Sequence, residues 1–378
     1  MNQQRLQQIF KQYIDRFEEL NTEHREIYKW EIAAEFQHFD VDAPNFVEML
    51  SHMQRTMQNI LDNKAQHPFI GLIECAKKPG EEETVREMFR ALYAQEVRTI
   101  PEKQAAINAF LASYNELKQR YFPESWQYNN DQRSVMTYLF FRYPNHYFAY
   151  KASEAKDFAD CVEFYEDWGT TNEFRLDRYE RMCEQLIEEI KKNDALLATH
   201  RSRYENAKTP LHPDENLHIL AFDIIYCSQA YGFYADMTFP KINAKARRLY
   251  EETVKEANKR YEKLQQAEQN MALLEEAKKS YADAFSVGSK ILHKTYGEGK
   301  IEESDGLNAT VHFSKTNETK KLGLPQSVKS GWIVIEDSAQ AEKLKSYESV
   351  LGQRTNIAAR WKHAMEEFEP YQEYFDGK

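Results

Sequence analysis

The chain has 378 residues, of which 42% are hydrophobic, 12 are glycine and 11 are proline. This much apolar surface excludes a disordered chain, and the low glycine and proline content disfavours folds built from many turns. A net charge of −11 argues against a protein that coats nucleic acid over its whole surface, because phosphate contacts need lysine and arginine. A local basic face is compatible with this charge, and the length predicts two or three folded units.

The sequence has no run of apolar residues long enough to predict a membrane span, and it starts with an amphipathic segment instead of an apolar signal core. Its cysteines, Cys75, Cys161, Cys183 and Cys227, are far apart and form no C-x-x-C pair. This spacing predicts reduced thiols and no disulfide framework. We therefore expect a cytoplasmic protein with no membrane partner.

Residues 1–240 are predicted to form a helical domain. Apolar residues at spacings of three and four predict a helix over 1–20, and a second helix is expected to start near Thr22. Asp42 is expected to cap a third helix that has Pro44 in its first turn. Proline and glycine residues separate further predicted helices at about 81–98, 101–120, 131–142, 153–165, 173–192 and 214–235.

The rest of the chain changes character twice. Residues 241–285 are rich in charge and predict a long connecting helix or one arm of an antiparallel hairpin, with a coiled-coil dimer as the alternative. Glycines flank short β-type runs within 286–336, which predicts a small, strongly bent β-barrel. Residues 337–378 are expected to form a C-terminal helix. The predicted fold class is mainly α.

Few motifs point to metal chemistry. Two Glu-x-x-His pairs, Glu35 with His38 and Glu215 with His218, are of the kind that holds a di-iron centre in helix bundles. With 61 acidic residues and 11 histidines, such pairs also arise by chance. The sequence therefore predicts no metal site and no cofactor.

Motifs for catalysis are also weak. The segment 296–300 contains Gly-Lys but lacks the other residues of a phosphate-binding loop, so nucleotide hydrolysis is not predicted. Glu298, Lys300 and Asp283 could form the acidic and lysine set of a metal-dependent nuclease. However, Gly297 and Gly299 predict a tight turn there, whereas such a nuclease displays its residues along a regular strand. No nucleophile motif occurs, and no catalytic residue is predicted.

Two features point to nucleic acid. The segment 121–150 is dense in aromatic residues that alternate with cations, and aromatic rings beside cations can stack single-stranded or flipped bases. Residues 1–240 are acidic, whereas the head of the predicted long helix is basic and could face phosphates. The alternatives are buried core aromatics and a solvated helix face. The candidate nucleic-acid-binding residues are Lys241, Lys245, Arg247, Arg248, Arg142 and Tyr147.

Several segments resemble a known family. They are Tyr28-Lys29-Trp30-Glu31, the run 138–144, Leu217-His218-Ile219-Leu220 and the run 239–248. They resemble the helical regions ahead of the motor in McrB-like AAA+ proteins of prokaryotic restriction and defence systems. The motor's own segments are not among the matching ones, so the resemblance implies a target-recognition or adaptor module and does not carry a GTPase activity.

The glycine-rich part resembles a second family. Val287-Gly288-Ser289-Lys290, Tyr296-Gly297-Glu298-Gly299 and Leu324-Pro325 are similar to the SH3/Tudor-like barrel at the C-terminus of UvrD/PcrA-type helicases. That barrel docks proteins, so the resemblance implies a protein partner such as a motor or nuclease subunit. The candidate docking residues are Tyr296, Lys320, Lys321 and Trp332.

Together these features predict a non-enzymatic recognition or adaptor subunit of a bacterial antiviral defence system of the McrB-like restriction type. It would contact DNA or RNA and dock a partner protein through the barrel. The first alternative is a purely protein-binding helical scaffold with no nucleic-acid contact. The second is a divergent metal-dependent nuclease. The oligomeric state stays open.

Overall fold

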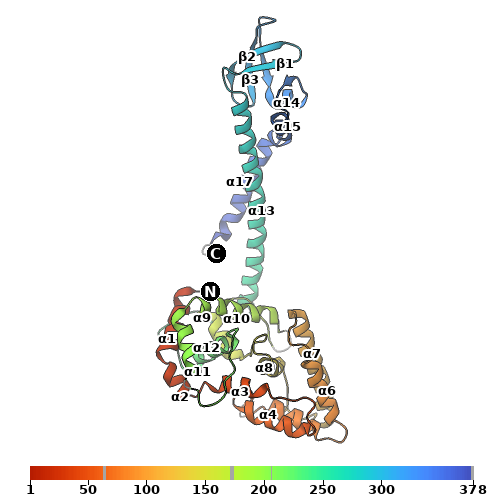
Figure 1. The fold of residues 1–378 in the computed structure, drawn as a ribbon, viewed down its shortest axis with the longest axis vertical. Helices are drawn as coiled ribbons and strands as arrows, with labels where there is room; N and C mark the ends of the chain where they lie inside the picture. The colour runs from red at the N-terminus through yellow and green to blue at the C-terminus, as the bar shows by residue number, and fades with distance from the viewer. Residues whose placement is uncertain (63–64, 171–173, 206, 376–378) are drawn as a thin grey trace. The chain divides into compact units, whose positions relative to one another are not determined.

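The computed structural model of the chain describes residues 1–378 except 63–64, 171–173, 206 and 376–378 (Figure 1). The described part is mainly helical and carries one five-stranded antiparallel sheet, which confirms the predicted mainly α class. All of its strands lie between Lys290 and Val334. The chain divides into two compact units, Met1–Glu251 and Glu252–Lys378. None of the helices in the described ranges has the length and apolar character needed to cross a bilayer.

The first unit is all helical where it is described. Its helices are α1 (Gln3–Asp15), α2 (Phe17–Thr22), α3 (Tyr28–Phe36), α4 (Phe46–Leu61), α5 (Pro68–Ala76), α6 (Glu82–Leu92), α7 (Ile100–Tyr121), α8 (Gln132–Arg142), α9 (Ala152–Cys161), α10 (Leu176–Lys191), α11 (Asp194–Glu205) and α12 (His218–Ala230). The start of α13 (Ala244–Ala284) also belongs to this unit.

The helix ends differ from prediction where capping decides them. The helix expected over 1–20 is interrupted at Arg16, whose side chain donates hydrogen bonds to Glu19 and to the carbonyl of Tyr231. The third predicted helix starts later than expected, because Asn45 and not Asp42 accepts the hydrogen bond from the N–H of Glu48. An amide oxygen at the N-cap fixes the first turn.

Much of the aromatic segment 121–150 lies in the core of the first unit. The ring centroids of Phe69, Phe110 and Tyr138 lie 5.3 to 6.1 Å from the ring centroid of Phe89, in edge-on or tilted arrangements. The Tyr138 hydroxyl donates to Asn130 Oδ1 at 2.6 Å, so its polar end is satisfied inside the core. The other buried rings of the segment are Phe140, Phe141, Tyr147 and Phe148. For these residues the alternative of buried core aromatics describes the structure.

The second unit combines the sheet with helices that follow it. Its elements after α13 are β1 (Lys290–His293), β2 (Gly297–Ser304), β3 (Asn308–Phe313), β4 (Glu318–Gly323), α14 (Leu324–Lys329), β5 (Ile333–Val334), α15 (Ser338–Ser346), α16 (Glu348–Gly352), α17 (Arg354–Phe368) and a 3-10 turn at Glu369–Tyr374. The strand order is β4-β3-β2-β1-β5, and the register between β2 and β3 shifts between Ile301 and Glu303. Such a bulge bends a sheet.

The sheet and α13 share one hydrophobic core. Val311 and Phe313 of β3 pack in the same cluster as Tyr281 and Phe285, and the Tyr281 hydroxyl donates to the carbonyl of Leu344 at 2.9 Å. The expected boundary after residue 285 therefore cuts through this core, whereas the observed division falls inside α13. The single C-terminal helix expected over 337–378 is divided into shorter helices up to Tyr374, and residues 376–378 lie outside the described residues.

Further along, α13 pairs with α17, which runs back beside it (Figure 1). Leu264 packs with Ala364 and Phe368, and Arg260 forms an ion pair with Glu367. Within the second unit α13 is thus one arm of an antiparallel helix pair.

The two glycines of the predicted turn have different roles. Gly297 has a φ of 77°, a left-handed value that favours glycine where the hairpin turn meets β2. Gly299 lies inside β2, and a Cβ there would lie 2.6 Å from Val311 Cγ1 and 2.7 Å from the Phe313 ring. Close packing therefore requires Gly299, and the expectation that turn geometry requires it was wrong.

Replacing Gly299 with alanine should lower the free energy of unfolding by about 1 to 3 kcal/mol, the usual cost of overpacking a core. The midpoint of urea unfolding, followed by circular dichroism, measures this loss. Gly323→Ala is the matched control, because a Cβ at Gly323 has no atom within 4 Å and its φ is negative. Equal midpoints for the two variants would contradict the close packing at Gly299.

Candidate functional site

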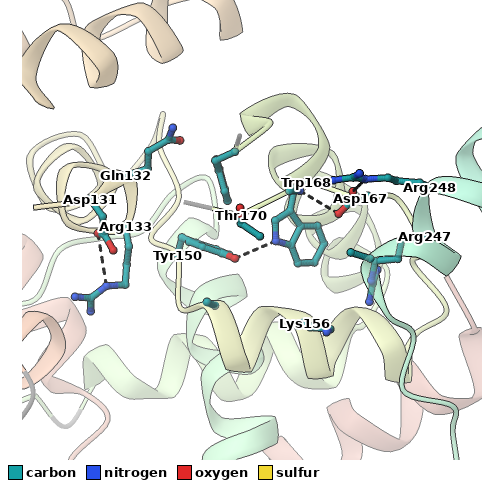
Figure 2. Close-up of a pocket in the computed structure, with 14 residues that line it drawn as sticks. Asp131, Gln132, Arg133, Tyr150, Lys156, Asp167, Trp168, Thr170, Arg247 and Arg248 are labelled. Atoms are coloured by element: carbon teal, nitrogen blue, oxygen red, sulfur yellow. Dashed lines mark hydrogen bonds and ion pairs between the residues drawn. The ribbon is translucent and has the colours of Figure 1, made fainter. Parts of the chain in front are cut away.

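A pocket of about 350 Å³ lies in the first unit where α8, α9, the loop before α10 and the head of α13 meet (Figure 2). It brings together segments that are far apart in the sequence. The residues that line it are Asp131, Gln132, Arg133, Tyr150, Ala152, Lys156, Asp167, Trp168, Gly169, Thr170, Phe174, Ala244, Arg247 and Arg248.

Three aromatic rings form one wall of the pocket. Trp168 and Phe174 are buried, and Tyr150 is half-buried. The Trp168 indole Nε1 donates to the Tyr150 hydroxyl at 3.0 Å, as Figure 2 shows, and the two rings are nearly perpendicular at 85°. The Tyr150 and Phe174 centroids are 4.7 Å apart. These contacts fix the rings in place, so the wall is preformed for a flat apolar ligand.

Arg247 supports the pocket from inside the fold. Its guanidinium forms an ion pair with buried Asp160, donates to the carbonyl of Phe164 at 2.9 Å and lies 5.5 Å from the centroid of the Trp168 ring. Burial raises the pKa of Asp160, and Arg247 opposes that shift by stabilising the carboxylate. Only 4% of the surface of Arg247 is exposed, so its positive charge stabilises the fold by pairing with Asp160 and is not presented to solvent.

Two other cations lie at the rim. The Arg248 side chain is 62% exposed and its Nε is 3.3 Å from Asp167 Oδ2. Lys156 is exposed and forms no hydrogen bond or ion pair with other described residues. Burial lowers the pKa of Lys151, next to Tyr150, to about 8, and the nearby Arg133 adds to that shift. The rim therefore offers positive charge to a ligand from Lys156 and Arg248.

The predicted basic strip is not one helix face. Lys241 precedes α13 and pairs with Asp157, whereas Lys245 in the first turn of the helix is exposed and has no polar partner among the residues described. Arg247 points inward. The expectation that the four cations face outward together does not hold, because buried Arg247 pairs with Asp160. Lys241 and Arg248 stay exposed and each contacts one carboxylate, Asp157 and Asp167.

Arg142 and Tyr147 do not line the pocket, and their side chains form hydrogen bonds within the first unit. Arg142 Nη1 donates to the carbonyls of Gln37 and Phe39, each at 3.3 Å. Tyr147 is 3% exposed and its hydroxyl accepts a hydrogen bond from Arg98 at 3.2 Å. A base can stack only on an accessible ring, so the structure does not offer Tyr147 for that role.

The pocket residues that the sequence analysis missed are Lys156, Trp168 and Phe174. A signal was present in Asp167-Trp168-Gly169, because glycine favours a turn and so predicts that the tryptophan before it lies in a loop. In the structure Gly169 has a φ of 78°.

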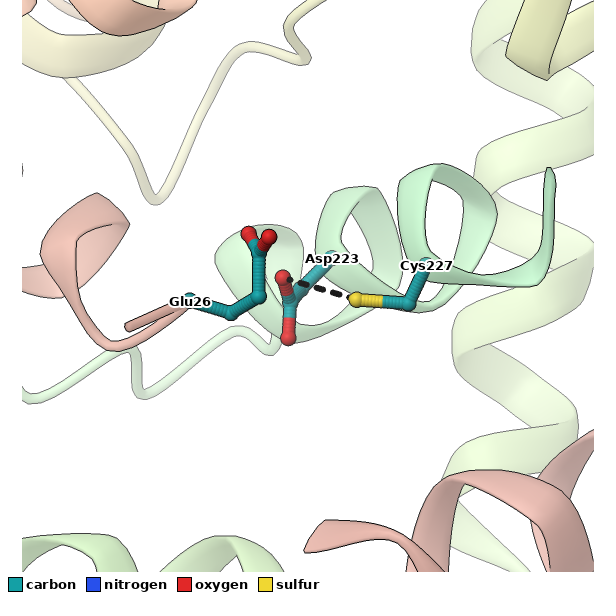
Figure 3. A group of neighbouring side chains, drawn as sticks. All are labelled: Glu26, Asp223 and Cys227. Carbon is teal, nitrogen blue, oxygen red and sulfur yellow. Dashed lines mark hydrogen bonds between the residues drawn. The ribbon is translucent and has the colours of Figure 1, made fainter. Parts of the chain in front are cut away.

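One cluster in the described part of the chain has the composition of a metal site: Glu26, Asp223 and Cys227 (Figure 3). Their ligand atoms lie within 4.8 Å of one another. However, the ammonium of Lys29 contacts Glu26 at 2.5 Å and also contacts Asp223, so it already supplies the positive charge. Burial opposes the charge on Lys29, but Asp223 and Glu26 keep its pKa well above the usual value. The cluster acts as a buried ion network.

The residues of the other motifs lie apart. Glu35 contacts His52 at 2.8 Å, while the His218 ring stacks on Phe148 with centroids 4.0 Å apart, so the two Glu-x-x-His pairs do not converge. Glu298 and Lys300 lie two residues apart on β2 and are exposed. No three-ligand cluster that includes them is found among the described residues.

The candidate docking residues of the second unit divide into two groups. Trp332 is 51% exposed, and Lys321 is exposed on β4. Tyr296 instead packs against Phe313 at 5.1 Å between centroids, with the Lys320 ammonium 5.7 Å from its ring.

Trp332 is followed two positions later by a further exposed apolar residue, Val334 of β5. Leu292 and Val334 pair across β1 and β5 and are both exposed, at 42% and 38%. Large exposed apolar side chains that lie together are typical of interaction surfaces.

No family model, no curated protein and no solved structure matches the chain. The functional interpretation therefore depends on the pocket and on the exposed sheet residues.

Proposed function

We propose that this protein is a non-enzymatic recognition or adaptor subunit of a prokaryotic defence system of the McrB-like restriction type. It contacts nucleic acid with the first unit and docks a partner protein with the second. One observation carries this proposal. The pocket joins Arg133 and Tyr150 of the aromatic segment to Arg248 at the head of α13, although Arg248 follows Tyr150 by 98 residues and Arg133 by 115.

The chemistry of the pocket suits a nucleic acid. Aromatic rings bind the faces of bases, and exposed cations bind phosphates with release of counterions. Lys156 and Arg248 at the rim and Lys245 in the first turn of α13 are the cations in position for phosphate contacts. The role needs no catalytic group.

In the second unit we propose that the curled sheet is an SH3/Tudor-like barrel whose partner is a motor or nuclease subunit. Trp332 supports docking, because tryptophan is enriched among the residues that dominate the binding energy of protein interfaces. Exposed Leu292 and Val334 add apolar surface of the kind found at interaction sites. The alternative of a purely protein-binding scaffold is favoured by the net charge of −11 and by the burial of Arg247 and Tyr147.

Fluorescence anisotropy with labelled single- and double-stranded oligonucleotides at several salt concentrations tests the nucleic-acid contact. Three phosphate contacts predict a slope of about −2 for log affinity against log salt on single strands. Lys156→Gln and Lys245→Gln should each make the slope shallower by about 0.7. Lys11→Gln, at an exposed ion pair on α1, is the control and should leave the slope unchanged. No binding at low salt would favour the purely protein-binding scaffold.

A further inference from the structure

We propose that the pocket between α8, α9 and α13 accepts a single unpaired nucleobase of a nucleic-acid strand, and that Lys156 and Arg248 contact the phosphates on either side of it. This rests on the proposed nucleic-acid contact and adds what enters the pocket. The observation behind it is the combination of a preformed aromatic wall with positive charge only at the rim.

The size of the pocket fits one ring system. Its volume of about 350 Å³ is near the lower end of the range for small-molecule sites, roughly 300 to 1,000 Å³. A paired or stacked base cannot reach such a concave site without leaving its neighbours. The ligand is therefore a base that is already unpaired or is turned out of its stack.

The walls favour a heteroaromatic ring over an aliphatic group. Tyr150, the half-buried ring of the wall, presents aromatic surface to the cavity, and buried Trp168 and Phe174 hold it in place. Stacking on such a ring is tolerant of the base's identity. The Tyr150 hydroxyl accepts from Trp168 and keeps its own hydrogen for donation. The Gln132 side-chain oxygen accepts a hydrogen bond from Gln104 at 3.4 Å, and its NH₂ group can donate to an acceptor on the edge of a base.

The charges place the phosphates outside the cavity. At its inner end Asp160 neutralises buried Arg247, so the inner end offers no net positive charge to an anion. At the rim, Arg248 shares Asp167 with Arg175, which also pairs with Glu251. Lys156 lies on α9 at the rim with its ammonium exposed. A base can thus enter while its flanking phosphates stay at the surface.

The test compares two fluorescein-labelled DNA strands that bind the full-length chain in an anisotropy titration. One strand consists of abasic residues only, and the other carries one central adenine or thymine among abasic residues. The base should strengthen binding by roughly 5- to 150-fold, the range for one stacked base. Tyr150→Leu should abolish this gain and leave the abasic strand's affinity unchanged. Tyr150→Phe, which keeps the ring, should retain most of the gain.

Trp126→Leu is the matched control, because Trp126 is an exposed aromatic residue of the same segment that does not line the pocket. It should leave the gain intact. Equal affinities for the two strands, or equal effects of Tyr150→Leu and Trp126→Leu, would overturn the base pocket while leaving nucleic-acid contact in place. If neither strand nor an ordinary oligonucleotide binds at low salt, the proposed function fails as well.

A competition experiment distinguishes two possible ligands of the pocket, a base within a strand and a free nucleotide. Adenosine and thymidine monophosphates are added as competitors of the strand that carries one base. Weak competition, at concentrations far above those of the strand, is expected, because a mononucleotide lacks the second phosphate contact. Competition as effective as that of the strand itself would overturn the proposal in favour of a free mononucleotide ligand.

Discussion

Replacing Lys29 with methionine should lower the free energy of unfolding of the first unit by about 3 to 5 kcal/mol. The Lys29 side chain is fully buried and its ammonium contacts the carboxylates of Glu26 and Asp223. Methionine fills a similar volume but carries no charge, so Glu26 would remain buried without a cation and Asp223 would keep only the more distant Arg203, at 3.9 Å. Removing one partner of a buried ion pair costs far more than the pair itself contributes.

Urea unfolding of the full chain measures this loss, and two variants serve as controls. Lys29→Met combined with Asp223→Asn removes one charge of each sign and should recover part of the stability. Lys11→Met removes an exposed ion pair with Asp15 and should change stability by less than about 1 kcal/mol. If Lys29→Met alone were as stable as the original protein, the network would not depend on this ammonium.

Arg247→Leu should also be strongly destabilising, by about 3 kcal/mol or more, since it leaves Asp160 buried without a counter-ion. It would remove the hydrogen bond to the carbonyl of Phe164 as well. At temperatures where the variant stays folded, the salt dependence of any nucleic-acid affinity should be unchanged, because this guanidinium is buried and its charge is paired with Asp160.

Lys245→Leu is the comparison for Arg247, two residues earlier on the same helix. Lys245 is exposed and has no polar partner among the described residues, so its loss should leave stability unchanged and make the salt slope shallower by about 0.7 on single strands. The reverse outcome, a stable Arg247→Leu variant with a shallower slope, would show that Arg247 contacts phosphate.

The spacing of apolar residues predicted the helices that bury one apolar face, such as α1, whose residues Leu6, Ile9 and Phe10 are buried. It could not find α5, where most residues from Pro68 to Ala76 are buried and no polar face marks the helix. The start of α4 also differed, because Asp42 and Asn45 are both good caps and only the fold selects between them.

The candidate site was predictable in its parts but not as a whole. Composition indicated aromatic and basic segments, yet the burial of a tyrosine depends on a partner for its hydroxyl. For Tyr179 that partner is the carbonyl of Ala149, 30 residues away. Likewise Arg248 and Asp167 are 81 residues apart. Tertiary contacts at such separations leave no local pattern in the sequence.

The ion network around Lys29 also bears on how the protein can be synthesised. Lys29 and Asp223 are 194 residues apart, and the Tyr13 hydroxyl donates to the same Asp223 carboxylate at 2.5 Å. While the nascent chain ends before α12, its N-terminal helices would bury a lysine without this acceptor. We expect the first unit to become resistant to protease on the ribosome only after residues 218–230 have left the exit tunnel. Expression fragments that stop before α12 should then accumulate in inclusion bodies.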